Sequence, residues 1–223
     1  MIMEDSKIYS MVDHTLLAAT ATWEDIAKLC DEAVLCGCAS VCIPPSFVKQ
    51  AHEAYPSLVI CTVIGFPLGY STENAKICEA TQAIEDGATE IDTVINIGDA
   101  KAGKFDKITV ELTALKKVTG SNILKVIIEC CYLSEDEKIA LCKCVTDSGA
   151  DYIKTSTGFG TGGATIDDIK LFKAHIGPNV KIKAAGGMRT RDDFIAFINE
   201  GCSRLGTSSA VKVLTGGGSQ GAY

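Results

Sequence analysis

The sequence predicts a closed (β/α)8 barrel that forms a single domain, and two observations support this fold class. Short runs rich in Val, Ile and Thr alternate with longer amphipathic segments, as in a parallel sheet covered by helices. A helix followed by Gly, then Ala or Cys, and then a strand recurs at 36–38, 86–88, 148–150 and 200–202. Eight strands alternating with eight helices suit a barrel, whereas an open doubly wound sheet, the alternative, usually has fewer strands.

The predicted elements follow one another with short loops between them. In chain order, we expect strands at 10–14, 39–43, 58–64, 89–95, 123–129, 151–155, 180–184 and 203–206. We expect helices at 23–36, 45–54, 72–86, 104–119, 134–147, 165–176 and 190–199, with a weaker helical pattern at 208–214. Ser134 is a typical N-cap because carboxylates follow it, and Gly37 and Gly201 suit left-handed C-caps.

The bulk composition excludes several classes of protein. A net charge of −7 and a pI near 5.0 disfavour nucleic-acid binding, and no apolar run is long enough to span a membrane. The eleven cysteines contain no Cys-x-x-Cys pair, so we interpret them as reduced core residues and expect no metal site. The N-terminus has no signal-peptide pattern, which favours a cytoplasmic protein. We expect a barrel domain at 1–214 and a flexible glycine-rich tail at 215–223.

Two lysines are the leading candidates for chemistry, because each closes a predicted strand and precedes glycines and hydroxyls. Lys154 belongs to the sixth strand and Lys183 to the seventh. Burial disfavours the charge of a lysine, but a neutral amine can attack a carbonyl and form a Schiff base. Consecutive strands bring the two ammonium groups close, so their repulsion would make one lysine neutral while the other stays charged. The alternative is that both are rim residues with solvated head groups.

Carboxylates also stand near predicted strand ends. Asp92 lies in a β-branched run, and a buried carboxylate normally has a partner, for which the two lysines are natural candidates. Asp92 could then transfer protons, although a purely structural ion pair is the alternative. Asp13 could orient a neighbouring group, and Glu129 could pair with either lysine. His14, near the expected mouth, is a further candidate.

Three glycine- or hydroxyl-rich loops follow the last three predicted strands, at 155–163, 185–189 and 206–209. Glycine lets the backbone approach an anion, and consecutive N–H groups bind phosphate oxygens. Barrels often hold phosphate with the loops after strands seven and eight. We therefore predict a phosphate site formed by these loops, to which Arg189 could add charge.

These features together indicate one type of reaction. An amine nucleophile, a second cation, a carboxylate and a phosphate site suit Schiff-base carbon–carbon chemistry on a sugar phosphate. The iminium ion withdraws electrons from the adjacent carbon, so the reaction needs neither a metal nor another cofactor.

A series of motifs along nearly the whole chain resembles the deoxyribose-phosphate aldolase family, which comprises class I aldolases on TIM barrels. The motifs are Asp13-His-Thr-Leu-Leu, Val41-Cys-Ile-Pro-Pro, Thr62-Val-Ile-Gly-Phe-Pro-Leu-Gly, Glu90-Ile-Asp-Thr-Val-Ile-Asn, Ile153-Lys-Thr-Ser-Thr-Gly-Phe, Lys183-Ala-Ala-Gly-Gly-Met-Arg-Thr and Arg204-Leu-Gly-Thr-Ser-Ser. Two residues depart from the family pattern. Thr93 stands where Met is usual, and Met188 stands where Ile or Val is usual. Neither is a reacting group, so only local packing or rate is in doubt.

The resemblance implies a reaction and a role for each matching residue. The reaction is reversible cleavage of 2-deoxy-D-ribose 5-phosphate into D-glyceraldehyde 3-phosphate and acetaldehyde. Lys154 would form the Schiff base, Lys183 would be the charge that favours its neutral form, and Asp92 would transfer protons. The implied phosphate ligands are Gly158, Gly186, Gly187, Gly206, Ser208 and Ser209.

The last residue of the chain adds a separate hypothesis. Tyr223 ends a glycine-rich segment that spans about 23 Å when extended, and its phenol could fold back and carry a proton to the enamine carbon. The alternative is a disordered tail without a catalytic role.

Two other functions remain open at the level of sequence. The chain could be another barrel enzyme of phosphorylated sugars, such as a transaldolase or an isomerase, or a non-catalytic barrel that binds a phosphorylated metabolite. In each case the partner is a small phosphorylated molecule. We expect a homodimer, because symmetric pairs are the commonest assemblies of soluble enzymes.

Overall fold

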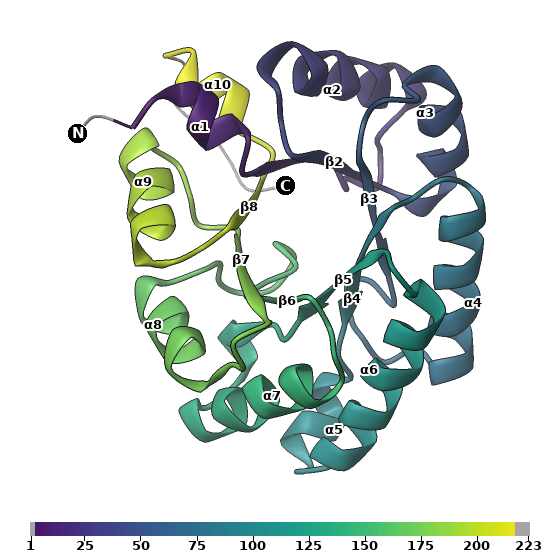
Figure 1. Cartoon of the computed structure of the whole chain (residues 1–223), viewed down its shortest axis with the longest axis vertical. Coiled ribbons are helices and arrows are strands. Elements are labelled where there is room, and N and C mark those ends of the chain that lie inside the picture. Colours follow the sequence, from purple (N-terminus) through teal and green to yellow (C-terminus); the bar gives the residue numbers. More distant parts are fainter. Residues whose placement is uncertain (1–2, 217–223) are drawn as a thin grey trace.

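The computed structural model describes residues 3–216, which fold into a closed barrel of eight parallel strands (Figure 1). Each strand pairs with the next along the chain, and the last strand pairs with the first to close the ring. The strands are β1 (Val12–Thr15), β2 (Ser40–Ile43), β3 (Ile60–Ile64), β4 (Glu90–Val94), β5 (Ile123–Ile127), β6 (Tyr152–Lys154), β7 (Lys181–Ala185) and β8 (Arg204–Thr207). The predicted (β/α)8 barrel is confirmed.

Helices surround the strands in an outer ring (Figure 1). The predicted ones are α2 (Trp23–Cys36), α3 (Val48–Ala54), α4 (Glu73–Glu85), α6 (Phe105–Thr119), α7 (Glu135–Asp147), α8 (Ile166–His175), α9 (Arg191–Glu200) and α10 (Ala210–Leu214). The predicted helix 45–54 begins instead as the 3₁₀ turn η1 (Pro45–Phe47). The sequence did not predict α1 (Asp5–Tyr9), α5 (Ile97–Lys101) and η2 (Cys130–Tyr132), which are too short to show a hydrophobic period.

Local sequence explains where several helices begin. The side chains of Thr22, Ser134 and Thr190 each accept a bond from the backbone N–H three residues on, and an acidic side chain at that position bonds back. These capping boxes start α2, α7 and α9. Gly37, with φ of 69°, ends α2 in the left-handed conformation that glycine adopts without strain.

Strand boundaries lie within two residues of those predicted, with one consequence for a candidate residue. The sequence predicts that Lys183 closes its strand, but it is the third of five residues in β7, because Ala185 still pairs with Gly206 of β8. Lys154 is the last residue of β6, as predicted. In the β6–β7 register Lys154 lies directly beside Lys183.

The two faces of the barrel wall carry different chemistry. Because successive strand residues point to opposite sides, Ile91 and Val126 face the helices and join the main apolar core. Asp92 and Lys125, their neighbours in sequence, face the barrel interior and are fully buried. The fold therefore places an ionic layer inside the barrel and a hydrocarbon layer outside it. Within residues 3–216, no helix has the length and apolar character needed to cross a membrane.

Candidate active site

Three side chains from three strands meet inside the barrel. The Nζ atoms of Lys154 on β6 and Lys183 on β7 each lie 2.7 Å from Oδ2 of Asp92 on β4. Lys154 is 3% exposed, and the other two side chains are completely buried. One carboxylate oxygen therefore contacts both ammonium groups, so neither lysine is a solvated rim residue.

A third buried lysine completes the contacts of this carboxylate. Lys125 Nζ on β5 lies 2.9 Å from Asp92 Oδ1 and 2.6 Å from Glu90 Oε2. Glu90 in turn accepts two hydrogen bonds of 3.0 Å from the guanidinium of Arg204. Such forked bonds hold both planar groups in one orientation.

Asp13, predicted as an orienting group, connects the two halves of this network. Its Oδ2 lies 2.5 Å from Lys183 Nζ, and its Oδ1 accepts bonds from Arg204 and from the hydroxyl of Ser40. The network thus holds four cations and three carboxylates, which leaves one cation in excess. Its members are Lys125, Lys154, Lys183, Arg204, Asp13, Glu90 and Asp92.

The charges in the network shift the pKa values of Asp92 and Lys183. Burial alone would raise the pKa of Asp92, but Lys125, Lys154 and Lys183 outweigh it and hold that pKa well below its usual range. Burial would lower the pKa of Lys183, yet Asp13 and Asp92 raise it above the ordinary lysine value. Lys183 consequently stays charged, because its carboxylate neighbours outweigh the repulsion between lysines.

Sequence reasoning missed Lys125, Glu90 and Arg204 as members of the site. The signal was present for Lys125, which interrupts the apolar run Ile123-Leu-Lys-Val-Ile and directly faces Asp92 in the β4–β5 register. A charged residue inside a predicted strand is as informative as one at its end, because the barrel interior is polar along much of its length.

Two other predicted candidates have different surroundings. Glu129 was considered as a partner of either lysine, but its hydrogen bonds come from the backbone N–H and hydroxyl of Thr157 and from the Cys131 thiol. Burial raises the pKa of Glu129. His14 is buried and faces α2, where its Nε2 lies 2.8 Å from Glu32, so the structure does not bring it to the lysines.

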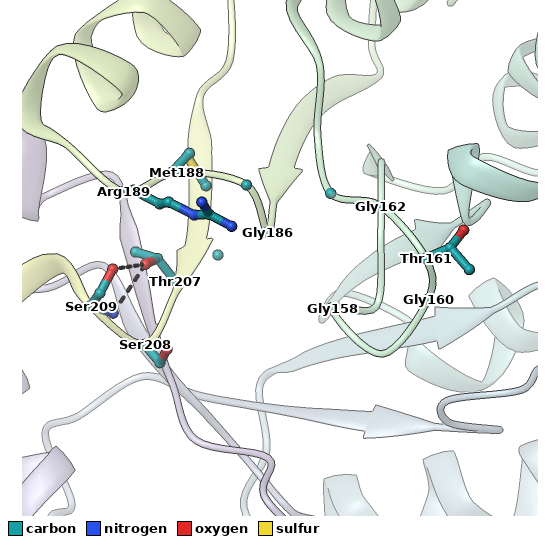
Figure 2. Close-up of a pocket in the computed structure, with 13 residues that line it drawn as sticks. Gly158, Gly160, Thr161, Gly162, Gly186, Met188, Arg189, Thr207, Ser208 and Ser209 are labelled. Atoms are coloured by element: carbon teal, nitrogen blue, oxygen red, sulfur yellow. Dashed lines mark hydrogen bonds between the residues drawn. The ribbon is translucent and has the colours of Figure 1, made fainter. Parts of the chain in front are cut away.

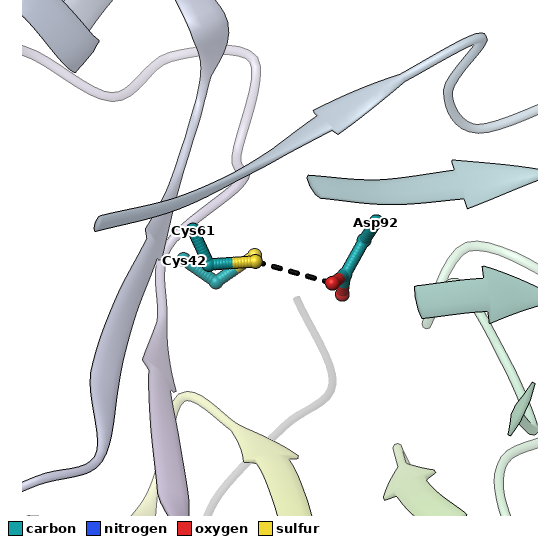
Figure 3. A group of neighbouring side chains, drawn as sticks. All are labelled: Cys42, Cys61 and Asp92. Atoms are coloured by element: carbon teal, nitrogen blue, oxygen red, sulfur yellow. Dashed lines mark hydrogen bonds between the residues drawn. The ribbon is translucent and has the colours of Figure 1, made fainter. Parts of the chain in front are cut away.

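Two cysteines adjoin the same carboxylate (Figure 3). Cys42 on β2 and Cys61 on β3 place their sulfurs and an oxygen of Asp92 within 4.8 Å of one another. The Cys61 thiol donates to Asp92 Oδ1 over 3.1 Å, and Lys125 Nζ donates to the Cys61 sulfur over 3.2 Å. The donor atoms could bind a metal by number, but an ammonium group already occupies two of them and would repel a cation.

A glycine-rich pocket of about 210 Å³ opens among the loops that follow β6, β7 and β8 (Figure 2). All six residues predicted to bind phosphate line it. The full lining is Gly158, Gly160, Thr161, Gly162, Gly163, Gly186, Gly187, Met188, Arg189, Gly206, Thr207, Ser208 and Ser209. Arg189 lies across the pocket from the loop that carries Thr161, and Thr207 and Ser209 share a hydroxyl hydrogen bond of 3.1 Å (Figure 2).

Side chains at several of these glycines would close the pocket or displace the lysines. Gly186 and Gly187 have φ of 71° and 80°, which disfavour other residues. A Cβ atom on Gly163 would lie 2.5 Å from the backbone of Gly187, and one on Gly206 would lie 3.0 Å from Lys183 Cε. The pocket and the lysine site are therefore built as one unit.

A small apolar cluster forms another wall near the lysines. Leu17, Cys42, Cys61 and Val63 pack together, and Phe66 packs against them. The Phe66 ring meets that of Phe159 edge to face, with centroids 5.4 Å apart. This pair joins the loop after β3 to the loop after β6.

Paired lysines on neighbouring strands of a barrel, bridged by a carboxylate beside a glycine-lined pocket, are the arrangement of a class I aldolase. The comparisons with known proteins agree. The sequence model of the DeoC/LacD family aldolases matches residues 7–217, and the chain belongs to this family.

The relatives and solved structures that the chain resembles are described as deoxyribose-phosphate aldolases or, in one case, simply as an aldolase. Deoxyribose-phosphate aldolase of Clostridium botulinum (strain Alaska E43 / Type E3) is 62% identical over 98% of the chain and its own full length. The Clostridioides difficile enzyme of that name is 60% identical over 93% of the chain and 95% of its length. The tetrameric deoxyribose phosphate aldolase of Aeropyrum pernix superposes with a TM-score of 0.89 at 30% identity, covering 95% and 91% of the two chains. QR15, an aldolase, superposes with a TM-score of 0.90 at 35% identity, covering 93% of this chain and 94% of its own.

These findings bear on several predictions. The predicted family, the barrel fold and the assignment as an aldolase, a carbon–carbon lyase, are confirmed, and the names of the relatives agree with the predicted function. The roles of individual residues stay predictions. Tyr223 lies outside the described residues, as does most of the predicted tail at 215–223.

Proposed function

We propose that this chain cleaves 2-deoxy-D-ribose 5-phosphate reversibly into D-glyceraldehyde 3-phosphate and acetaldehyde through a Schiff base on Lys154. One observation carries the proposal: Asp92 Oδ2 lies 2.7 Å from both Lys154 Nζ and Lys183 Nζ. An amine held against a carboxylate can exchange its proton locally, and a second fixed cation keeps that carboxylate ionised.

Lys154 is the lysine best suited to react as a free amine. It has one carboxylate partner in the network, Asp92, whereas Lys183 has two and Lys125 has three. Because the network holds one cation in excess, the loss of one proton balances its charges. The proton held by the fewest carboxylates is removed at the smallest electrostatic cost.

The reaction then follows from the positions of these groups. The Lys154 amine adds to C1 of the open-chain sugar, and loss of water gives a protonated imine. The imine draws electrons from the C2–C3 bond, which breaks as the C3 hydroxyl loses its proton and the phosphorylated aldehyde departs. The remaining enamine takes a proton at C2, and hydrolysis releases acetaldehyde and the free amine. Asp92 carries protons in these steps, and Lys183 balances its charge.

The phosphate group would bind in the glycine-lined pocket. Gly186 and Gly187 present backbone N–H groups in consecutive left-handed conformations, the geometry that holds anion oxygens. Gly158, Gly206, Ser208 and Ser209 complete its wall. Arg189 adds a positive charge. A small phosphorylated sugar is thereby held with its aldehyde end toward Lys154.

Borohydride trapping with acetaldehyde tests the proposal. We expect reduction to leave an N-ethyl group on Lys154, located by peptide mass spectrometry, and turnover of 2-deoxyribose 5-phosphate. Lys154→Ala should lose both, while Lys143→Ala, at an exposed lysine, should keep both. An isomerase would give no adduct. A non-catalytic barrel would bind the sugar phosphate but show no turnover, so Lys154→Ala would remove none. Either result would overturn the assignment.

Tyr223 is proposed as a proton carrier to the enamine carbon. A phenol can donate and accept a proton, and the tail is long enough to return to the barrel mouth. Deletion of Tyr223 should slow the exchange of acetaldehyde methyl protons with solvent more than it slows imine formation. Unchanged exchange would leave the tail without a catalytic role.

We also propose the setting in which the enzyme works. All eleven cysteines are free thiols, which suits a reducing cytoplasm and a place in the breakdown of deoxyribonucleotides and carbohydrates. We propose a homodimer, although the Aeropyrum pernix relative is described as tetrameric. Light scattering across a dilution series distinguishes these states. Residues 1–214 are proposed as one domain with 215–223 as its tail, and truncation after residue 214 should leave the unfolding temperature unchanged.

A further inference from the structure

Cys42 and Cys61 form a pair of buried thiols that the proposed mechanism does not use. They are direct partners in the register between β2 and β3, and both side chains are fully buried. Their sulfur atoms lie within 4.8 Å of each other and converge on the same side of Asp92 (Figure 3).

The backbone geometry at this pair suits a disulfide. Neighbouring parallel strands lie about 4.8 Å apart, within the Cα separations of about 4.4–6.8 Å that disulfides span. Because paired residues face the same side of the sheet, both Cβ atoms of Cys42 and Cys61 point into the barrel. Side-chain rotation can therefore join the sulfurs while the strands keep their places.

The same pair is connected to the catalytic carboxylate. The Cys61 thiol donates a hydrogen bond of 3.1 Å to Asp92 Oδ1, the oxygen that also contacts Lys125. A disulfide has no S–H group, so oxidation removes this donor. It also moves the Cys61 sulfur toward Cys42 and away from Lys125 Nζ, which donates to it over 3.2 Å.

We propose that Cys42 and Cys61 are a modification site, at which hydrogen peroxide forms a reversible disulfide that switches off the aldolase. The loss of activity rests on the function proposed above, whereas a peptide map detects the bond without reference to that function.

The chemistry is balanced by peroxide alone. The Cys42 thiolate attacks one peroxide oxygen, which gives a sulfenic acid, and the departing hydroxide takes up the proton that the thiol released. The Cys61 sulfur then attacks the sulfenic sulfur, and its proton leaves with the hydroxyl as water. In total, two thiols are oxidised to one disulfide and one peroxide is reduced to two waters. Hydrogen bonding with Cys61 lowers the pKa of Cys42, while burial keeps the pKa of Cys61 high, so Cys42 is oxidised first.

Other cysteines of the chain lack this combination of features. Cys142 and Cys144 lie two residues apart on α7, where side chains do not face each other, and Cys78 lies exposed on α4. Lys154 is almost as buried as the two cysteines yet must receive an aldehyde, so a molecule as small as peroxide can follow the same path. Bulky disulfide reagents cannot follow this path, so they should oxidise exposed thiols but not Cys42 and Cys61.

The first experiment locates the bond. The reduced full-length protein is treated with hydrogen peroxide, remaining thiols are alkylated, and peptides are mapped without reduction. We expect a peptide pair linked through Cys42 and Cys61, lost again after dithiothreitol. If the Lys154 imine is first formed with acetaldehyde and reduced with borohydride, the resulting ethyl group occupies the interior. We expect the Cys42–Cys61 disulfide to form more slowly in that protein. Absence of the linked pair in the treated wild type would overturn the site.

The second experiment measures the switch. The rate after peroxide is expressed relative to the same variant kept in dithiothreitol, so a change in basal rate does not affect the result. We expect the wild type and Cys78→Ser to lose at least about tenfold, the effect of one lost hydrogen bond to a charged group, and to recover on reduction. Cys42→Ala should keep its rate, because the remaining Cys61 thiol is a poor nucleophile.

The outcomes separate the two levels of the proposal. A linked pair without loss of rate would overturn the switch, and equal sensitivity of Cys42→Ala would assign the loss to another thiol. If the reduced protein has no aldolase activity, the proposed function fails while the peptide map still decides whether the disulfide forms.

Discussion

Lys125 offers the sharpest test of the buried charge network, because it is completely buried and pairs with three carboxylates. Its Nζ lies 2.6 Å from Glu90, 2.9 Å from Asp92 and 3.6 Å from Asp13. Lys125→Met keeps the length of the side chain but removes the charge, leaving carboxylates without part of their compensation. Removal of one partner from a buried pair typically costs about 3–5 kcal/mol. For a domain of this size, that corresponds to a fall in the unfolding temperature of roughly 6–20 °C.

The pH dependence of the loss follows from the sign of the shift at Asp92. Its pKa in the folded protein is well below the ordinary value: burial would raise it, and Lys125 is the first of the lysines that lower it. Such a carboxylate stabilises the fold above its unfolded pKa of about 3.9, and the contribution disappears as the pH falls through the folded pKa. The difference between wild type and Lys125→Met should therefore be full at pH 7 and shrink below about pH 4.

Urea unfolding followed by circular dichroism at several pH values provides the measurement. Lys143→Met is the matched control, because Lys143 also lies 2.6 Å from a carboxylate but is exposed, and it should unfold like the wild type. Adding Glu90→Gln should be less damaging in Lys125→Met than in the wild type, since it removes an uncompensated charge. A Lys125→Met protein as stable as the wild type at pH 7 would refute this account.

Three further predictions test other parts of the structure. Gly187→Ala places a side chain on a residue with φ of 80° and brings its Cβ to 3.2 Å from Ala164 O. Steady-state kinetics should show a higher KM for the sugar phosphate and a smaller change in KM for unphosphorylated deoxyribose. Burial raises the pKa of Glu129, so its ionisation in the folded protein costs stability once the pH rises above the unfolded value of about 4.3. Glu129→Gln should therefore gain stability relative to the wild type as the pH rises above about 4 in urea titrations. Lys76→Met removes the buried partner of Glu111, 2.6 Å away, in an ion pair outside the network. It should lower the unfolding free energy by about 3–5 kcal/mol in the same titrations. The borohydride-trapped adduct should still form.

Much of the architecture could be predicted because the alternation of strands and helices is written in local patterns. Strands such as 39–43 and 89–95 combine β-branched residues with flanking glycines, so their positions follow from the sequence. The short helix α5 (Ile97–Lys101) could not be predicted, because five residues show no period and depend on the Asn96 cap and on packing against α6.

The candidate site was predictable to the extent that its residues follow strands. Lys154 and the glycine loops were found in this way, whereas Asp92 was noted as a carboxylate within a β-branched run. Arg204 and Glu90 were not, because they stand at the opposite ends of their strands, and only the stagger of a closed barrel brings such residues under the reactive layer. The contact between Glu129 and Thr157 likewise depends on Glu129 adopting φ of 56°, which sequence does not reveal.

The low pKa of Asp92 raises a question about its role, because a carboxylate stabilised by three ammonium groups is a weak base. In the mechanism proposed above, the charge on Lys154 accounts for this role. Once Lys154 has lost its proton, the free amine and the carbinolamine that it forms are both neutral, so Asp92 keeps only Lys125 and Lys183 as cationic partners. Its basicity is then higher than in the fully charged network, at the stage when protons must be moved to and from the substrate hydroxyls. The enamine left after C–C cleavage is neutral as well, and its protonation at carbon restores the positive charge at Lys154, which stabilises the carboxylate that Asp92 becomes on giving up the proton. The buried network thus couples the proton affinity of Asp92 to the covalent state of its neighbour, and this coupling requires the full set of charges that the barrel interior holds in place.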